Sequence, residues 1–260
     1  TFGLAASSCV PASSFESPGA AFSPADIRHL ITEFNAIGIG EVMNYPAVIS
    51  GDPTFREIIA AAGWRSVDGH APGLRGSQLD AYLAAGVESD HECFALDEAH
   101  EKRQKGMWVF LRYGSACKDL EELLPTVLTN GPTRTAMCTD DREPHQIRTI
   151  GHINHCVRLA VAAGCNEIDA LIMATFLPAQ FHNFFHLGQL GPGYQADILV
   201  FDTLADYRPA VVYQAGRLVA RNGAIIPGVV PATPAPDSLR NRVHLHHNPS
   251  AQELTVEEPT

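Results

Sequence analysis

Short apolar runs alternate with amphipathic stretches over residues 1–187 of the chain. The amphipathic stretches repeat apolar positions at helical spacing, as Ile27, Leu30, Ile31 and Phe34 do. Short apolar runs are typical of buried parallel strands, and amphipathic stretches are typical of helices that cover a sheet. The pattern predicts strands over residues 4–10, 39–44, 64–68, 87–90, 107–112 and 135–139.

Capping residues, prolines and glycines mark the predicted helices. Ser23-Pro24 and Asp52-Pro53 each place an N-cap residue before a proline at the first helical position. Asp97 is predicted to cap a helix that is rich in charged residues. With glycines taken as helix ends, the predicted helices cover residues 24–37, 53–62, 77–85, 98–105, 120–128, 146–163 and 167–176.

Each predicted strand carries a polar residue at or near its carboxyl end. These residues are Ser8, Glu41, His70, His91, Arg112 and Asp140. An open α/β sheet gathers its ligands at one switch point, whereas a barrel collects residues from many strand ends at one rim. The chain supplies about six of the eight strand–helix units of a complete barrel. We therefore predict an α/β fold, an incomplete (β/α)8 TIM-like barrel that lacks its first two strands.

The pattern changes after residue 187. Residues 191–202 are predicted to form a turn and a strand, and residues 210–219 a hairpin. From residue 227 the chain is rich in proline and alanine without a periodic pattern, which predicts an irregular tail. The expected organisation is a barrel part over 1–187, a small antiparallel β layer over 188–226 and a tail over 227–260.

Charge and composition exclude several classes of function. The net charge of −11 disfavours nucleic acid as a partner, and no apolar run approaches the length of a membrane span. The six cysteines form no CxxC pair, which favours reduced thiols and a cytoplasmic location. The first residue is threonine, so we expect the natural protein to begin upstream of it.

The rim residues have the chemistry of a divalent metal site. Imidazoles from His70 and His91 and carboxylates from Glu41 and Asp140 suit one or two ions. A divalent ion there lowers the pKa of bound water from about 15.7 towards about 7, which supplies hydroxide at neutral pH. The rim is therefore a candidate site for metal-assisted hydrolysis.

Neighbouring polar residues suit proton transfer and substrate binding. Asp140 could accept the proton of that water, and Glu92, next to His91, could protonate the substrate. Arg112 and Ser115 are expected to orient a polar substrate.

Structural roles remain open for the same residues. A histidine after a strand commonly makes only hydrogen bonds, although the glycines and proline around His70 favour a functional loop. Glu41 in an apolar strand is costly unless it is paired or bound to a metal. Asp140 or Asp141 could cap the following helix, and Arg112 could simply neutralise a rim carboxylate.

Other histidines are weaker candidates. His152 and His155 lie three positions apart and His182 and His186 four apart, without the glutamate of an HExxH motif. The His244-Leu-His246 sequence in the tail is expected to have no functional role.

Several short motifs together resemble the adenine deaminases of the amidohydrolase superfamily, and the resemblance runs from near residue 4 to about residue 225. The motifs, in chain order, are Ser8-Cys-Val-Pro-Ala12, Gly40-Glu-Val-Met-Asn44, Asp68-Gly-His-Ala-Pro-Gly-Leu74, Ser89-Asp-His-Glu92, Gly114-Ser-Ala116 with Lys118, Cys138-Thr-Asp-Asp-Arg142, Gly151-His-Ile153 and Met173-Ala-Thr175.

The resemblance implies hydrolytic deamination of adenine at a binuclear centre of Mn²⁺ or Fe²⁺, with Zn²⁺ as a further candidate. Glu41 would bridge the metals, His70 and His91 would be ligands, and Asp140 would be both ligand and proton shuttle. Glu92 would be the acid for a purine ring nitrogen. The β layer would be part of a β-sandwich whose first strands precede the barrel.

The chain departs from the family's pattern in several places. The family carries a His-x-His pair at the end of its first barrel strand, and residues 1–40 of this chain contain no such pair. Tyr113 and Ile150 stand where glutamate is expected, and Leu177 stands where asparagine is expected. We therefore expect little or no deaminase activity from this chain alone.

Two alternatives to an adenine deaminase remain open. One is another amidohydrolase, such as an aminopurine deaminase or a cyclic-amide hydrolase, with a pocket altered by Tyr113 and Ile150. The other is a truncated, non-catalytic pseudoenzyme. Because an open barrel exposes strand edges and apolar surface, we also expect a homo-oligomer.

Overall fold

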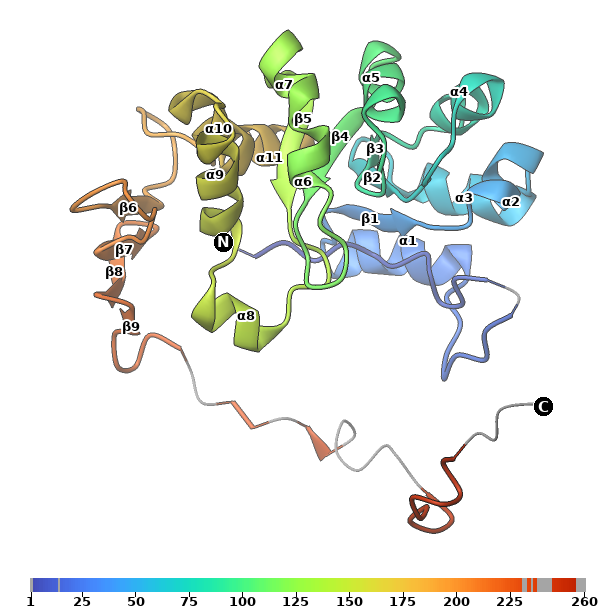
Figure 1. Cartoon of the computed structure of the whole chain (residues 1–260). Coiled ribbons are helices and arrows are strands. Elements are labelled where there is room, and N and C mark those ends of the chain that lie inside the picture. Colours follow the sequence, from blue (N-terminus) through green and yellow to red (C-terminus); the bar gives the residue numbers. More distant parts are fainter. Residues whose placement is uncertain (1, 14, 231–232, 235, 238–244, 256–260) are drawn as a thin grey trace.

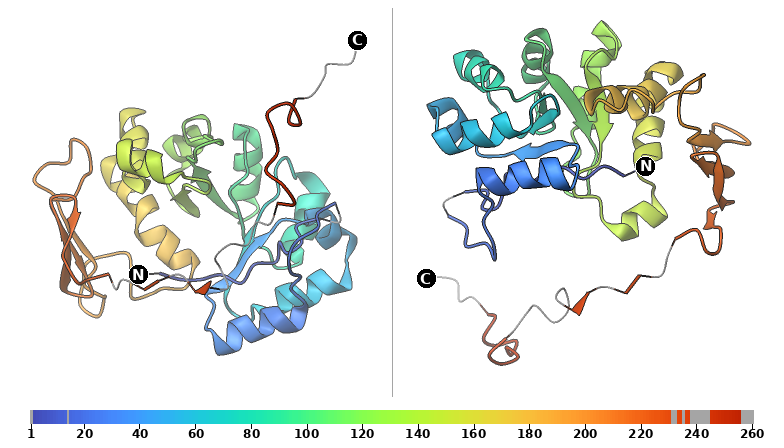
Figure 2. Two further views of the ribbon diagram at one scale, coloured as in Figure 1. Left: turned by 90° about the horizontal axis from the view of Figure 1, so that it is seen from below. Right: turned by 180° about the vertical axis from the view of Figure 1, so that it is seen from behind.

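Parallel strands form a curved wall in which the order in space follows the order along the chain (Figures 1 and 2). The computed structural model describes residues 2–13, 15–230, 233–234, 236–237 and 245–255. One parallel pair is β1–β2, and β3, β4 and β5 form a second parallel sheet in that order. The strands are β1 (Gly38–Val42), β2 (Ser66–Gly69), β3 (Ser89–Asp90), β4 (Trp108–Arg112) and β5 (Thr135–Cys138).

The two parallel sheets are continuous through the backbone. The Glu88 N–H donates to the Val67 carbonyl at 3.0 Å, and the Trp108 N–H donates to the Glu88 carbonyl at 2.8 Å. The wall therefore runs from β1 to β5 without a gap, as in a barrel.

The predicted strand over residues 4–10 is wrong in extent. Only Ala6 bridges to β1, at Ile39. Beyond it, the side chains of Ser8 and Cys9 both donate to the Glu41 carbonyl, at 2.5 and 2.8 Å. These side-chain bonds and the missing N–H of Pro11 turn the segment away from strand pairing.

Helices lie between and after the strands, and most of them cover the outer face of the wall (Figure 1). They are α1 (Pro24–Glu33), α2 (Tyr45–Ser50), α3 (Pro53–Ala61), α4 (Gly76–Ala84), α5 (Leu96–Gln104), α6 (Leu120–Leu123), α7 (Pro125–Asn130), α8 (Pro144–Thr149), α9 (Ile153–Ala162), α10 (Glu167–Ala174) and α11 (Phe176–Phe181). The predicted caps of α1 and α3 are confirmed, because Ser23 accepts from the Asp26 N–H and Asp52 from the Thr54 N–H.

Several helix predictions are wrong. The single helix predicted over 146–163 is two, α8 and α9, because Gly151 between them has a φ of +124°. Pro125 similarly begins a new helix, α7, where one helix was expected over 120–128. Asp97 is not the cap of α5, since the helix begins at Leu96 and Asp97 pairs with Arg75.

A small antiparallel sheet lies beside α9 and α10 (Figure 1). It contains β6 (Ile198–Val200), β7 (Val211–Gln214), β8 (Arg217–Arg221) and β9 (Ala224–Ile225) in that order. The predicted hairpin is confirmed as β7–β8, which turns at Ala215 and Gly216, both with positive φ. The described residues beyond 226 hold no α-helix or strand, and His244 lies outside them. The division of the chain at residues 187 and 226 stays a prediction.

Successive residues of β4 point to opposite sides of the wall, one side towards the core under the helices and the other towards the site. Val109 and Leu111 of β4 pack under the helices in one hydrophobic cluster with Leu123 and Val157. The intervening Phe110 points to the opposite side, where Phe181 of α11 packs edge-on against it with ring centroids 5.0 Å apart. By the same alternation, Arg112 at the end of β4 lies on the side of Phe110, which is the inner side of the wall.

The described residues also bear on two expectations from composition. None of the helices in this part of the chain combines the length and apolar character that a membrane crossing requires. All six cysteines are described, and each is a free thiol.

Candidate metal centre

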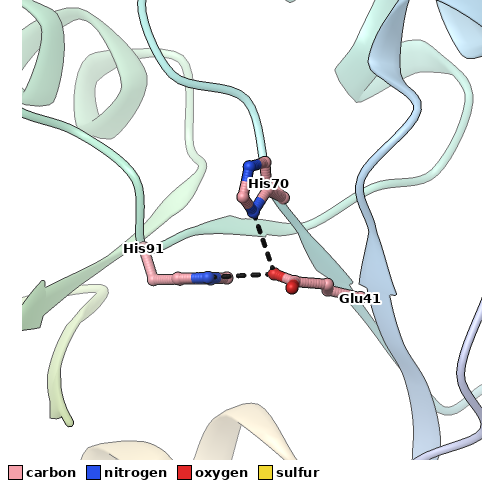
Figure 3. Close-up of side chains that lie close together, drawn as sticks. All are labelled: Glu41, His70 and His91. Carbon is pink, nitrogen blue, oxygen red and sulfur yellow. Dashed lines mark hydrogen bonds and ion pairs between the residues drawn. The ribbon is translucent and has the colours of Figure 1, made fainter. Parts of the chain in front are cut away.

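Three residues from three neighbouring strand ends meet in one place (Figure 3). Glu41 belongs to β1, and His70 and His91 follow directly after β2 and β3. The Oε2 atom of Glu41 lies 3.2 Å from Nδ1 of His70 and 2.9 Å from Nε2 of His91. One donor atom from each residue lies within 4.8 Å of the others. The expectation that neighbouring strand ends bring these residues together is therefore confirmed.

The imidazoles and the carboxylate shift each other's pKa. Burial raises the pKa of Glu41, but the hydrogen bonds with His70 and His91 outweigh it and hold the pKa at about 2. Burial lowers the pKa of His91, but the hydrogen bond and the charge of Glu41 raise it above its ordinary value. The Glu41 carboxylate is therefore ionised at neutral pH and available to a cation.

A second group of donors adjoins the first. His91, Glu92 and Asp140 also offer donor atoms within 4.8 Å of one another. Glu92 Oε1 lies 3.6 Å from Nε2 of His91 and 3.8 Å from Nδ1 of His70. The five residues predicted for the metal and proton-transfer roles therefore lie in one continuous cluster. They are Glu41, His70, His91, Glu92 and Asp140.

Arg112 is engaged by carboxylates. Its guanidinium group, from the end of β4, donates to Glu92, to Asp140 at 3.2 Å and to Asp119 at 3.0 Å. Only 4% of its side chain is exposed. This geometry agrees with the alternative that Arg112 neutralises rim carboxylates, and its predicted contact with substrate stays a prediction.

Ser115 does not line the cavity that opens beside the cluster, which is described below. Its hydroxyl accepts from the Glu143 N–H at 2.9 Å. Asp141 accepts from the N–H groups of Ser115 and Ala116, at 3.0 and 2.7 Å. The expectation that Asp140 or Asp141 caps the following helix is wrong, because α8 has Glu143 as its N-cap and no side-chain cap.

A cavity of about 260 Å³ opens beside the cluster. This volume lies just below the roughly 300–1,000 Å³ typical of ligand pockets. The residues that line it are Gly40, Glu41, Asp68, His91, Phe110, Cys138, Asp140 and His182.

Two further residues line the cavity: Asp68, which the sequence did not single out, and His182, which was only a weaker candidate. Burial raises the pKa of Asp68 to about 6, against the hydrogen bond from Ser89, and burial lowers the pKa of His182 to about 4. Asp68 could have been found, since it is a carboxylate at the end of an apolar strand, as Glu41 is. Only the fold places His182 in the cavity, because it follows α11 and its Nδ1 lies 3.1 Å from the hydroxyl of Ser66, 116 positions away.

Tyr82 of α4 connects two of the elements that carry the metal-site residues. Its hydroxyl donates to the Val42 carbonyl at 2.6 Å and accepts from the His70 N–H at 3.1 Å. The side chain is fully buried. The position of the His70 backbone relative to β1 therefore depends on this hydroxyl.

Replacing Tyr82 with phenylalanine is expected to lower the free energy of unfolding by about 1–3 kcal/mol, since two buried backbone groups lose their partner. Urea denaturation followed by circular dichroism measures the change. Tyr45→Phe is the matched control, because no described residue bonds to the Tyr45 hydroxyl, and it should change stability by less than about 0.5 kcal/mol. Equal effects of the two substitutions would contradict the role of the Tyr82 hydroxyl.

The chain is similar in sequence to bacterial adenine deaminases. It is 43% identical over 216 residues to adenine deaminase 2 of Carboxydothermus hydrogenoformans, an alignment that covers 83% of this chain and 38% of that protein. It is 41% identical over 225 residues to the adenine deaminase of Nitratidesulfovibrio vulgaris, covering 86% and 39%. The chain therefore spans less than half the length of these relatives.

Solved structures show the fold. Beta-aspartyl dipeptidase from Fervidobacterium islandicum superposes with a TM-score of 0.58 at 14% identity, covering 80% of this chain and 64% of that chain. N-isopropylammelide isopropylaminohydrolase from Burkholderia multivorans gives 0.56 at 22% identity, covering 83% and 62%. At these identities the likeness concerns the fold alone, and it confirms the predicted TIM-like class. The model of the amidohydrolase family matches residues 2–230, and the chain belongs to that family.

Proposed function

We propose that the chain carries the metal site of an adenine deaminase, which hydrolyses adenine to hypoxanthine and ammonia. The observation that carries the proposal is the meeting of Glu41, His70 and His91 at one rim. It is supported by the identity of about two residues in five to proteins named adenine deaminases. The substrate is then a small purine base.

The donor set fits a divalent metal ion, as is general in amidohydrolases. Two imidazoles face one ionised carboxylate oxygen, a combination that suits Mn²⁺, Fe²⁺ and Zn²⁺. Glu41, His70, His91 and Asp140 would hold the metal, and we favour Mn²⁺ or Fe²⁺. When bound, the metal supplies Lewis acidity and makes water more acidic at neutral pH.

The carboxylates around the metal site suit the proton transfers of a deamination. Asp140 lines the cavity and is 43% exposed, so it can accept a proton from the attacking water. Glu92 lies beside both histidines and would donate a proton to a purine ring nitrogen. Arg112 binds both carboxylates and so holds their spacing. Ser115 and Arg112 as direct substrate contacts stay predictions.

The alternative of another amidohydrolase activity has less support. It was based on Tyr113 and Ile150, and neither residue lines the cavity beside the cluster. The ring of Tyr113 instead packs edge-on against His155, with centroids 5.0 Å apart.

The proposal is tested by ammonia release from adenine in the presence of Mn²⁺. We expect little or no release by the 260-residue chain, and release by the same chain extended upstream with a His-x-His segment. Activity of the extended chain on another amine or a cyclic amide, but not on adenine, would contradict the proposal. Ordinary enzyme rates from the 260-residue chain would contradict the expected inactivity. The cytoplasmic location and the homo-oligomer stay predictions.

A further inference from the structure

A fully buried lysine lies next to both histidine-bearing segments. Lys102 of α5 has no exposed side-chain surface. Its Nζ donates to the Ala71 carbonyl at 2.7 Å, to Asp90 Oδ2 at 2.8 Å and to Glu98 Oε1 at 2.6 Å. These three bonds use all the donors of an ammonium group.

The partners of Lys102 also bind each other's segments. Asp90 accepts from the Ala71 N–H through Oδ1 at 2.8 Å, and Glu98 accepts from the Gly73 N–H at 2.8 Å. Ala71 directly follows His70, and Asp90 directly precedes His91. These hydrogen bonds therefore connect the backbone next to His70 with the backbone next to His91.

We propose that the Lys102 ammonium is a positioning residue that holds His70 and His91 at the separation a shared metal ion requires. The two imidazole centroids lie 5.6 Å apart. This inference rests on the proposed metal site. Lys102 itself contacts neither imidazole and acts through Ala71 and Asp90.

A separate metal site at this cluster is the competing explanation. Asp90, Cys93 and Glu98 offer donor atoms within 4.8 Å of one another. The cluster already contains its cation, however, because the ammonium of Lys102 binds both carboxylates. Burial lowers the pKa of Lys102, but the charge of Asp90, with smaller contributions from Cys93 and Glu98, raises it above its ordinary value, so the ammonium stays charged.

Packing alone does not require a charge at this position. Burying an ammonium and two carboxylates carries a large desolvation cost, and an apolar side chain of similar length would fill the space without it. What an apolar side chain cannot do is donate to the Ala71 carbonyl and to Asp90 at once. The function of the charge is therefore the connection between the two segments.

Lys102→Met tests the proposal, since methionine keeps the length and removes the donors. Lys102→Met with Glu98→Gln is the second variant, because it restores the formal charge of the cluster without restoring the connection. Glutamine at 98 keeps the size of the side chain and an oxygen that can accept from the Gly73 N–H. Val157→Ala is the control, a core truncation in α9, a helix that supplies no partner to the Lys102 ammonium.

Calorimetric titration with Mn²⁺ and imidazole ¹⁵N–¹H spectra of the metal-free protein give the two readouts. We expect both Lys102 variants to raise the dissociation constant for Mn²⁺ by about 10–100-fold, the range for residues that orient metal ligands. We also expect the signals of His70 and His91 to shift or broaden, while those of His152 and His182 stay unchanged. The Val157→Ala control should lose stability, but its affinity for Mn²⁺ and the imidazole signals of His70 and His91 should stay unchanged.

The outcomes separate this inference from the proposed function. A folded double variant that keeps its affinity within about threefold and its imidazole signals would overturn the role of Lys102. Failure of the parent chain to bind Mn²⁺ would contradict the metal site, and the imidazole spectra would still decide whether Lys102 positions the two histidines.

Discussion

Replacing Glu41 with glutamine is expected to raise the dissociation constant for Mn²⁺ by at least about 100-fold, beyond the 10–100-fold typical of residues that only orient ligands. Glu41 is the carboxylate that contacts both imidazoles, at 3.2 and 2.9 Å. Glutamine has nearly the same size, but it carries no charge and turns one oxygen into a donor. Calorimetric titration with Mn²⁺ measures the change.

Glu33→Gln is the control for this substitution. Glu33 is an exposed residue at the end of α1, so its replacement removes the same charge without touching the metal-site cluster. The dissociation constant of the Glu33→Gln variant for Mn²⁺ should equal that of the parent chain. If Glu41→Gln and Glu33→Gln bind Mn²⁺ equally well, the ion is held elsewhere and the proposed site is wrong.

Truncating Leu111 to alanine is expected to lower the free energy of unfolding by about 2–5 kcal/mol. Leu111 is fully buried in β4, pairs in register with Met137 of β5 and packs under the helices. Its loss leaves a cavity between the central strands and the helices, where neighbouring side chains have little freedom to close it. Urea denaturation followed by circular dichroism gives the value.

Leu128→Ala is the matched control for the core substitution. Leu128 of α7 is 49% exposed, so the same truncation there should change stability by less than about 0.5 kcal/mol. A loss below about 1 kcal/mol for Leu111→Ala, or equal losses for both leucines, would show that β4 is not the centre of the core.

Much of the fold could be predicted from the sequence because the signals are local. Apolar runs give β1 to β5 within a few residues, and Ser23 and Asp52 cap their helices as expected. The meeting of Glu41, His70 and His91 follows from one rule, that neighbouring parallel strands end at the same rim.

The missed features depend on contacts between distant residues. The amphipathic pattern over 146–163 continues through Gly151, and only its φ of +124° separates α8 from α9. Asp97 has the composition of a cap, but Arg75 from the previous unit binds it instead. His182 reaches the cavity because α11 folds back onto β4, and no periodic pattern records such a return.

The agreement between strand order and chain order has a consequence for the timing of synthesis. Because β1 to β5 follow one another along the wall in chain order, a ribosome delivers Glu41, His70 and His91 in the order of the strands that carry them. About 50 residues separate Glu41 from His91, which takes roughly 3 to 10 seconds at 5–20 residues per second. The nascent chain presents the carboxylate alone until His70 is made, and then the carboxylate with one imidazole for the next 21 residues, until His91 is made. Capture of an ion by all three donors therefore has to wait until His91 has left the exit tunnel.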